Sequence, residues 1–263
     1  MSEMTKQQTQ QQSFLTTINV PLPSKGLLYP VDSPLHKKES VDVREMTANE
    51  EDILTSLSMI RTGKSIDEVI KACLMTPNLD PDKMLVGDRN SIITGLVLAS
   101  YGNKYKVDVK CENCNETNKN YEFDINNLPV KYLEVSSVQE GLNEFDFELP
   151  KSKKKVTFML PTADIEKEIS NHIKKLQNIS HQETNSTTRL KYLLLSIDGN
   201  NDKKKIAEFL DRKQMPIIDS IELRKYIDSI SPDIDTNQDF QCQQCGWSGK
   251  ITIPVNFNFF WRN

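Results

Sequence analysis

The segments Cys111-Glu112-Asn113-Cys114 and Cys242-Gln243-Gln244-Cys245 decide how this chain must fold. Each is a Cys-x-x-Cys pair with strand-like or polar sequence on both sides. A tight turn with this spacing places two sulfurs about 3.8 Å apart, the separation of neighbouring ligands around a tetrahedral zinc ion. Each pair therefore predicts the turn of a β-hairpin, and the two turns together predict one site.

The residue after each pair supports the same interpretation. The chain usually leaves such a turn with a positive φ, and Asn115 and Gly246 are of the two residue types that tolerate this conformation best. Backbone N–H groups, with Lys110 and Lys250 nearby, are expected to stabilise the negatively charged sulfurs. We predict a structural zinc site with four ligands: Cys111, Cys114, Cys242 and Cys245.

Other uses of these cysteines fit less well but stay open. A redox pair stands at the start of a helix, whereas polar turns and strand-like runs follow both pairs here. Disulfides need an oxidising compartment, and the sequence begins with Met1-Ser2-Glu3 and Gln-rich residues rather than a signal peptide. A catalytic zinc would need a position for water. The fifth cysteine, Cys73, lies in an apolar run and predicts a buried side chain.

The amino-acid composition argues against several classes of protein. The 263 residues include 33 basic and 37 acidic side chains, and the net charge of −4 argues against a domain that mainly covers phosphates. The hydrophobic content of 37% is enough for a core. The longest apolar run, Ile92 to Ala99, falls short of the roughly 18 residues that span a bilayer. We expect no membrane segment.

The pattern along the chain predicts an α+β fold. Its parts are a helical N-terminal half, a discontinuous four-Cys zinc-ribbon β element, and a mostly helical insertion between the two Cys turns. The predicted regions are a disordered tail (1–13), an extended proline-containing arm (14–46), a helical region (47–103), a zinc-ribbon-like β region (104–144 and 233–263), and a hairpin followed by a helical insertion (145–232).

Both ends of the chain carry candidates for partner binding. The arm contains Leu27, Leu28 and Tyr29, which must pack on the protein itself or on a partner. The C-terminal run from Ile251 alternates apolar and polar residues, which favours a last ribbon strand with Phe257 and Phe259 in the core. The alternation breaks at the final aromatic pair, and we therefore add Phe260 and Trp261 to the candidates.

No combination of residues predicts an active site. Gly63-Lys64-Ser65 resembles the end of a phosphate-binding loop, but Ser58 stands where that loop needs its first glycine. The acidic residues lie at expected helix starts and solvated faces, without an apolar surround that would shift the pKa of a carboxyl pair. We therefore expect a protein that is not an enzyme.

The order of several short motifs resembles the T-even-type bacteriophage baseplate protein family. The similarity covers roughly residues 18 to 261 and is weakest over 145–232. It is carried by the two Cys pairs, the Phe-rich C-terminus and four segments: Leu22-Pro23-Ser24-Lys25-Gly26-Leu27-Leu28-Tyr29, Arg44-Glu45-Met46-Thr47, Gly87-Asp88-Arg89 and Ala99-Ser100-Tyr101-Gly102.

The resemblance implies a non-enzymatic phage tail protein that acts in assembly of the baseplate hub, as an assembly factor or minor structural component. It implies hub or other tail proteins as partners, without a small-molecule substrate or membrane, in the host cytoplasm during assembly or in the virion baseplate. The alternative is a nucleic-acid-binding zinc-ribbon accessory protein of phage transcription. That role usually brings a basic face, whereas the charges near these turns are mixed.

Overall fold

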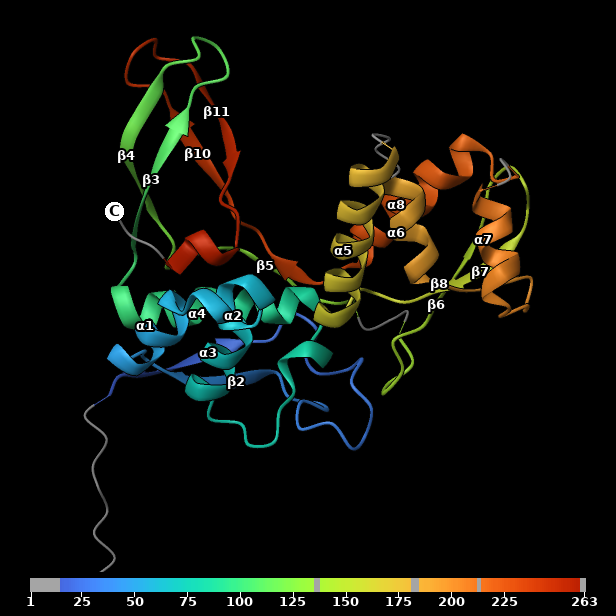
Figure 1. Ribbon diagram of the computed structural model, residues 1–263, viewed down its shortest axis with the longest axis horizontal. Helices are drawn as coiled ribbons and strands as arrows, with labels where there is room; N and C mark the ends of the chain where they lie inside the picture. The colour runs from blue at the N-terminus through green and yellow to red at the C-terminus, as the bar shows by residue number, and fades with distance from the viewer. Residues whose placement is uncertain (1–14, 135–137, 181–184, 212–213, 261–263) are drawn as a thin grey trace, which may run out of the picture.

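The computed structural model describes residues 15–134, 138–180, 185–211 and 214–260. The predicted tail and Trp261 lie outside these ranges. Figure 1 shows three parts: an N-terminal body (17–101), a ribbon of two hairpins that projects from one end of it (104–124 and 237–252), and an insertion at the other end of the body (145–230). Mixed helices and small sheets confirm the α+β class.

The expectation of a helical N-terminal half is wrong, because this half also contains strands. Strand β1 (Thr17–Pro21) pairs antiparallel with β2 (Ser40–Arg44), and Val20 lies opposite Val41. Both valines are buried, since alternate residues of the hairpin face the helices. The proline-containing segment between the two strands hides their pairing in the sequence.

The helices expected after the arm are present. They are α1 (Ala48–Thr55), α2 (Leu57–Thr62), α3 (Ser65–Cys73), the 3-10 turn η1 (Pro81–Lys83) and α4 (Val86–Tyr101). Helix α2 ends where Gly63 adopts φ 69°. Within the predicted helical region, Pro81 opens only a short 3-10 turn, and the last helix begins at Val86.

Helix α4 is the centre of the N-terminal body. Two glycines let other segments approach its backbone closely. A Cβ atom at Gly95 would lie 2.3 Å from the Val20 side chain, and one at Gly87 would lie 1.9 Å from the Pro232 carbonyl oxygen. The β1–β2 hairpin and the chain returning from the insertion therefore both pack directly on α4.

The proline-containing arm is fixed to α4 by a buried carboxylate. Asp88 accepts hydrogen bonds from the Ser24 backbone N–H at 2.9 Å, from the Ser24 hydroxyl, and from the Tyr29 hydroxyl at 2.7 Å. The hydroxyl oxygen of Tyr29 in turn accepts a hydrogen bond from the Leu85 N–H at 3.0 Å. This cluster joins segments 22–29 and 87–89, which are separate motifs in the sequence.

The insertion combines a small sheet with helices. Its sheet has the order β6 (Phe145–Glu148), β7 (Lys155–Phe158) and β8 (Leu194–Ile197), and its helices are α5 (Ala163–Ser180), α6 (Asn185–Leu193), α7 (Lys203–Asp211) and α8 (Ile217–Ile230). The hairpin expected around 145–160 is confirmed. At the junction with the ribbon, β5 (Val130–Lys131) pairs with β9 (Asp233–Ile234).

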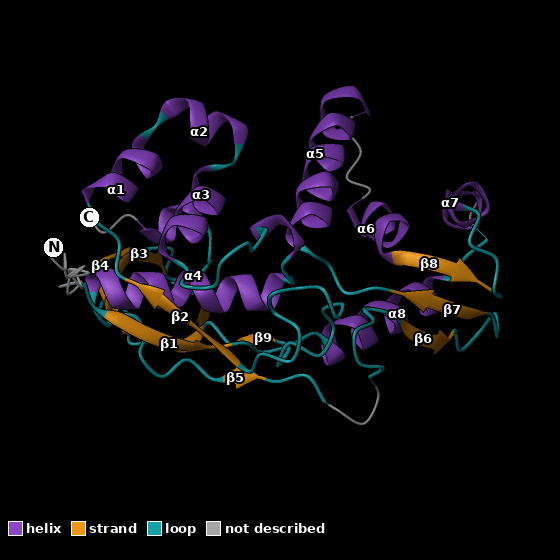
Figure 2. Cartoon of the chain, turned by 90° about the horizontal axis from the view of Figure 1, so that it is seen from below, coloured by secondary structure: helices purple, strands orange, loops and turns teal. Residues whose placement is uncertain are grey.

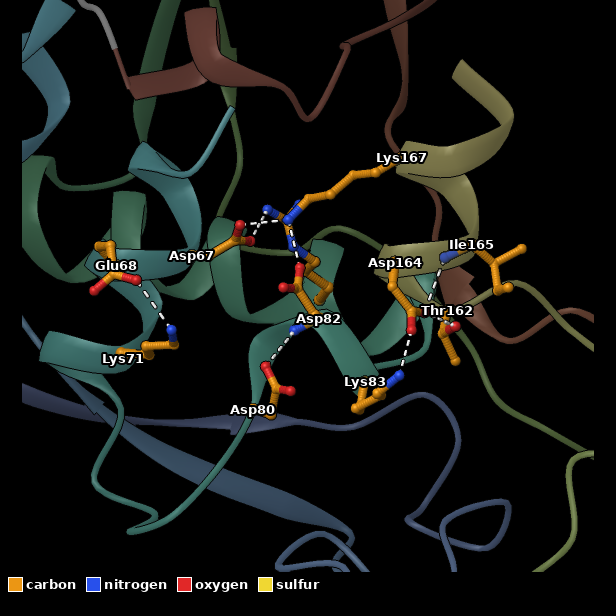
Figure 3. A network of polar contacts seen from close by, with 11 residues as sticks. Asp67, Glu68, Lys71, Asp80, Asp82, Lys83, Thr162, Asp164, Ile165 and Lys167 are labelled. Carbon is orange, nitrogen blue, oxygen red and sulfur yellow. Dashed lines mark hydrogen bonds and ion pairs between the residues drawn. The ribbon is translucent and has the colours of Figure 1, made fainter. Parts of the chain in front are cut away.

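A polar network attaches α5 to the N-terminal body (Figure 3). The buried carboxylate of Asp67 on α3 accepts from Arg89 at 2.9 Å and from Lys167 of α5, which also bonds Asp82. Burial disfavours the charged Lys167, but both carboxylates outweigh this effect and raise its pKa. Lys83 adds a 2.6 Å ion pair with Asp164. The insertion is therefore joined to the N-terminal body by side-chain contacts as well as by the chain itself.

Glu50 links α1 to β2 and makes the fold sensitive to acid. It accepts from Arg44 at 2.9 Å and from the Thr47 N–H at 2.7 Å. The Arg44 bond, opposed by burial and helped by Thr47, lowers the Glu50 pKa from 4.5 to about 2. Because the folded pKa is the lower one, this stabilisation is complete above pH 4.5 and is lost as the pH falls toward about 2.

We therefore expect Glu50→Gln to lower the free energy of unfolding at neutral pH by about 2 kcal/mol. Denaturant unfolding at a series of pH values measures this difference, which should shrink steadily in the acid range. A difference that does not change with pH would contradict the assignment.

Among the residues that the structure describes, no helix has both the length and the apolar character needed to cross a bilayer.

Candidate metal centre

Each Cys pair lies at the turn of a β-hairpin, as predicted. The first turn joins β3 (Lys104–Lys110) to β4 (Thr117–Asp124), and the second joins β10 (Asn237–Gln241) to β11 (Ser248–Thr252).

The two turns share one hydrogen-bond pattern. The first cysteine of each pair accepts from the residue after the second cysteine: Asn115 N–H bonds Cys111 O at 3.0 Å, and Gly246 N–H bonds Cys242 O at 2.9 Å. Asn115 has φ 61° and Gly246 has φ 73°, which confirms the positive φ expected at both. The same local geometry is therefore formed twice.

The four sulfurs converge on one point. Cys111 Sγ lies 3.8 Å from Cys245 Sγ, and Cys114 Sγ lies 3.7 Å from Cys242 Sγ. All four sulfur atoms lie within 4.8 Å of one another, and all four cysteines are free thiols rather than disulfides. Tetrahedral zinc–sulfur bonds of about 2.3 Å would require sulfur separations close to these. The donor set thus fits a single metal ion.

Two asparagines, rather than the predicted lysines, donate to the sulfurs. The buried Asn118 directs Nδ2 to Cys242 Sγ at 3.5 Å and accepts from the Gln243 N–H at 2.8 Å, while Asn113 Nδ2 lies 3.6 Å from Cys245 Sγ. In the described part of the chain, no polar contact joins Lys110 or Lys250 to a sulfur. The amides therefore take the role assigned to the lysines.

These donors favour the thiolate form that binds metals. Burial opposes ionisation of Cys242, but the Asn118 amide and the backbone N–H groups of Cys245 and Gln244 outweigh it and lower the Cys242 pKa to about 6. At Cys114 the Glu116 N–H favours the thiolate, yet desolvation and the neighbouring sulfurs raise the pKa to about 12. Four thiolates at these distances need a cation between them.

Outside the sulfur cluster, Tyr121 also connects the two hairpins. They form separate two-stranded sheets. Tyr121 packs edge-on against Phe240 with ring centroids 4.9 Å apart, and its hydroxyl accepts from the Gln241 N–H at 3.2 Å. A metal bound by the four sulfurs would therefore be the main cross-link between hairpins that are far apart in the sequence.

A family model for the "T4 bacteriophage base plate protein" matches residues 18–261. The chain belongs to this baseplate family. The match confirms the resemblance seen in the short motifs and includes the insertion, where that resemblance was weakest. Searches among curated proteins and among solved structures gave no significant match.

In this baseplate protein, most of the candidate partner residues lie in its own core. Leu28, Tyr29 and Phe260 are buried, and Leu27 is partly buried. Trp261 lies outside the described residues. The arm thus packs on the protein itself, one of the two alternatives that its sequence left open.

The predicted strand at the C-terminus is wrong. Strand β11 ends at Thr252, and η3 (Phe257–Phe260) is a 3-10 helix. Pro254 has no N–H for a ladder and so interrupts the alternating run. Phe259 is nevertheless buried, with its ring centroid 4.8 Å from that of Tyr105 at the base of the ribbon. Phe257 is only partly buried.

Proposed function

We propose that this baseplate-family protein acts in assembly of the baseplate hub, as an assembly factor or a minor structural component, and catalyses no covalent reaction. The observation that supports this most is the family match over residues 18–261. It implies interaction with other phage tail proteins.

We further propose that the ion bound by the four cysteines is zinc and that its role is structural. Thiolates in tetrahedral sets are typical zinc ligands. Cysteine sulfurs fill all four positions, so a bound zinc would have no site for water or substrate. The role of the zinc would be to hold the two hairpins together, which suits a scaffold whose surfaces bind other proteins.

Complementation of a phage that lacks this gene tests the proposal. Host cells supply the wild-type chain or Cys242→Ser, with Cys73→Ala as a control because Cys73 is buried away from the sulfur cluster. Hub assembly is followed by sedimentation of tail intermediates. We expect wild type and Cys73→Ala to restore complete hubs and Cys242→Ser to fail.

Two results would overturn the proposal. One is normal hub assembly in the phage without the gene. The other is hub failure accompanied by loss of phage transcripts and by tight, salt-dependent binding of the purified protein to DNA, which would favour the transcription accessory role.

A further inference from the structure

A cleft of about 590 Å³ separates α2 of the N-terminal body from α5 of the insertion. Figure 2 shows these two helices standing on the same side of α4. The start of α4 contributes to the same cleft. The charged side chains that line it are Arg61, Arg89, Glu166, Lys167, Lys174 and Arg189.

Helix α5 presents a polar face to this cleft. Residues 163, 166, 167, 170, 171 and 174 line it and recur at helical spacing, so they form one face. Ile169, which is buried, and Ile165 lie outside this set and pack in the core. Helix α5 therefore buries its apolar side in the core and turns its polar side toward the cleft.

Positive charge dominates the walls. Carboxylates neutralise three of the five cations: Asp67 pairs with Arg89, Asp67 and Asp82 pair with Lys167, and Glu166 pairs with Arg189. The remaining two, Arg61 on the α2 wall and Lys174 on the α5 wall, are exposed and have no ion-pair partner among the described residues. The cleft thus carries an unbalanced positive charge on both sides.

Apolar groups accompany these cations. Ile60 and Val255 line the cleft, and Leu57, one turn before Ile60 on α2, is 70% exposed. Such a mixture suits a polypeptide that offers both carboxylates and apolar side chains. It suits a nucleic acid less well, because a phosphate backbone needs a longer row of free cations and the whole chain carries a net charge of −4.

We infer that this cleft is the docking site for an acidic amphipathic segment of another protein. The inference rests on the proposed function in one respect, namely that the partner is another tail protein. The carboxylates of the segment would pair with Arg61 and Lys174, and its apolar side chains would cover the exposed residues of α2.

A binding measurement on the full-length protein tests the cleft directly. The probe is a fluorescent synthetic helix of repeating Glu and Leu, compared by anisotropy with the same peptide carrying Gln in place of Glu. We expect Arg61→Gln with Lys174→Gln to weaken binding of the Glu peptide about fivefold, as expected for two lost surface ion pairs. The control removes two exposed α7 lysines, Lys203→Gln with Lys205→Gln, and should leave the affinity unchanged.

Equal losses in the cleft and control variants, or equal binding of the Glu and Gln peptides, would overturn the inference. So would tighter binding of a single-stranded oligonucleotide than of the Glu peptide. The same cleft variant in the phage complementation assay separates this inference from the proposed function. If wild type restores hubs and the cleft variant restores them equally, only the docking site is wrong; if wild type itself has no effect on hubs, the proposed function is wrong.

Discussion

Replacing Cys111 with serine is expected to remove the proposed zinc and to lower the free energy of unfolding by at least about 4 kcal/mol. Cys111 is fully buried, and a serine hydroxyl stays protonated at neutral pH and cannot replace a thiolate ligand. Loss of the ion would leave the remaining sulfurs without a compensating cation and the two hairpins without their cross-link. Metal content by elemental mass spectrometry and denaturant unfolding measure the two effects.

The matched control is Cys73→Ala. Cys73 is equally buried but lies outside the sulfur cluster, and burial raises its pKa to about 11. This variant should keep one zinc per chain and lose only about 1 kcal/mol for the small cavity. A Cys111→Ser protein that retains one zinc per chain with unchanged unfolding would refute the assignment of the ligands.

The effect should extend beyond the ribbon. The residues between the two Cys pairs include the whole insertion, and the chain that returns from it packs on α4 at Gly87 before it reaches β10. After β11, Phe259 packs against Tyr105 at the start of β3. Loosening the second hairpin would therefore also loosen the C-terminal segment, which the ribbon holds against the N-terminal body.

The sequence predicted correctly that the four cysteines come together, because the geometry of each pair is local. A Cys-x-x-Cys turn followed by a residue that tolerates positive φ determines where two sulfurs lie, whatever surrounds them. The role of Asn118 could not be seen in this way. It depends on how the two hairpins face each other, which no short segment encodes. Asn118 stands four residues after Cys114, which places it near the first turn, but only the approach of the second hairpin brings its amide to Cys242.

The pairing of the arm was missed for the same reason. The β1–β2 hairpin pairs residues that stand far apart in the sequence, as Thr17 does with Arg44, and proline-rich turns separate them. Strand pairing of this kind is non-local, whereas helix patterns and hairpins with short turns are local. The helices of the N-terminal body and the 145–160 hairpin were therefore predictable, but the pairing of the arm was not.

Asp88→Ala should be the most damaging substitution in the N-terminal body. The carboxylate is fully buried and accepts hydrogen bonds from the Ser24 backbone N–H and from the hydroxyls of Ser24 and Tyr29. Alanine would leave these donors without an acceptor in a site that excludes water and would release the arm from α4. Because each buried unsatisfied group costs about 1–3 kcal/mol, we expect a loss of about 4 kcal/mol in the free energy of unfolding.

Asp88→Asn separates the role of shape from that of charge. Burial raises the pKa of Asp88, although the bonds from Ser24 and Tyr29 oppose it. Because the folded pKa is the higher one, the proton-linked stabilisation is present below the ordinary value of 3.8 and is lost as the pH rises through the folded pKa. The stability advantage of wild type over Asp88→Asn should therefore decrease as the pH rises above 3.8.

Hydrogen exchange at the Ser24 and Leu85 amides reports whether the arm has detached in Asp88→Ala. Unchanged protection of these amides would show that other contacts hold the arm.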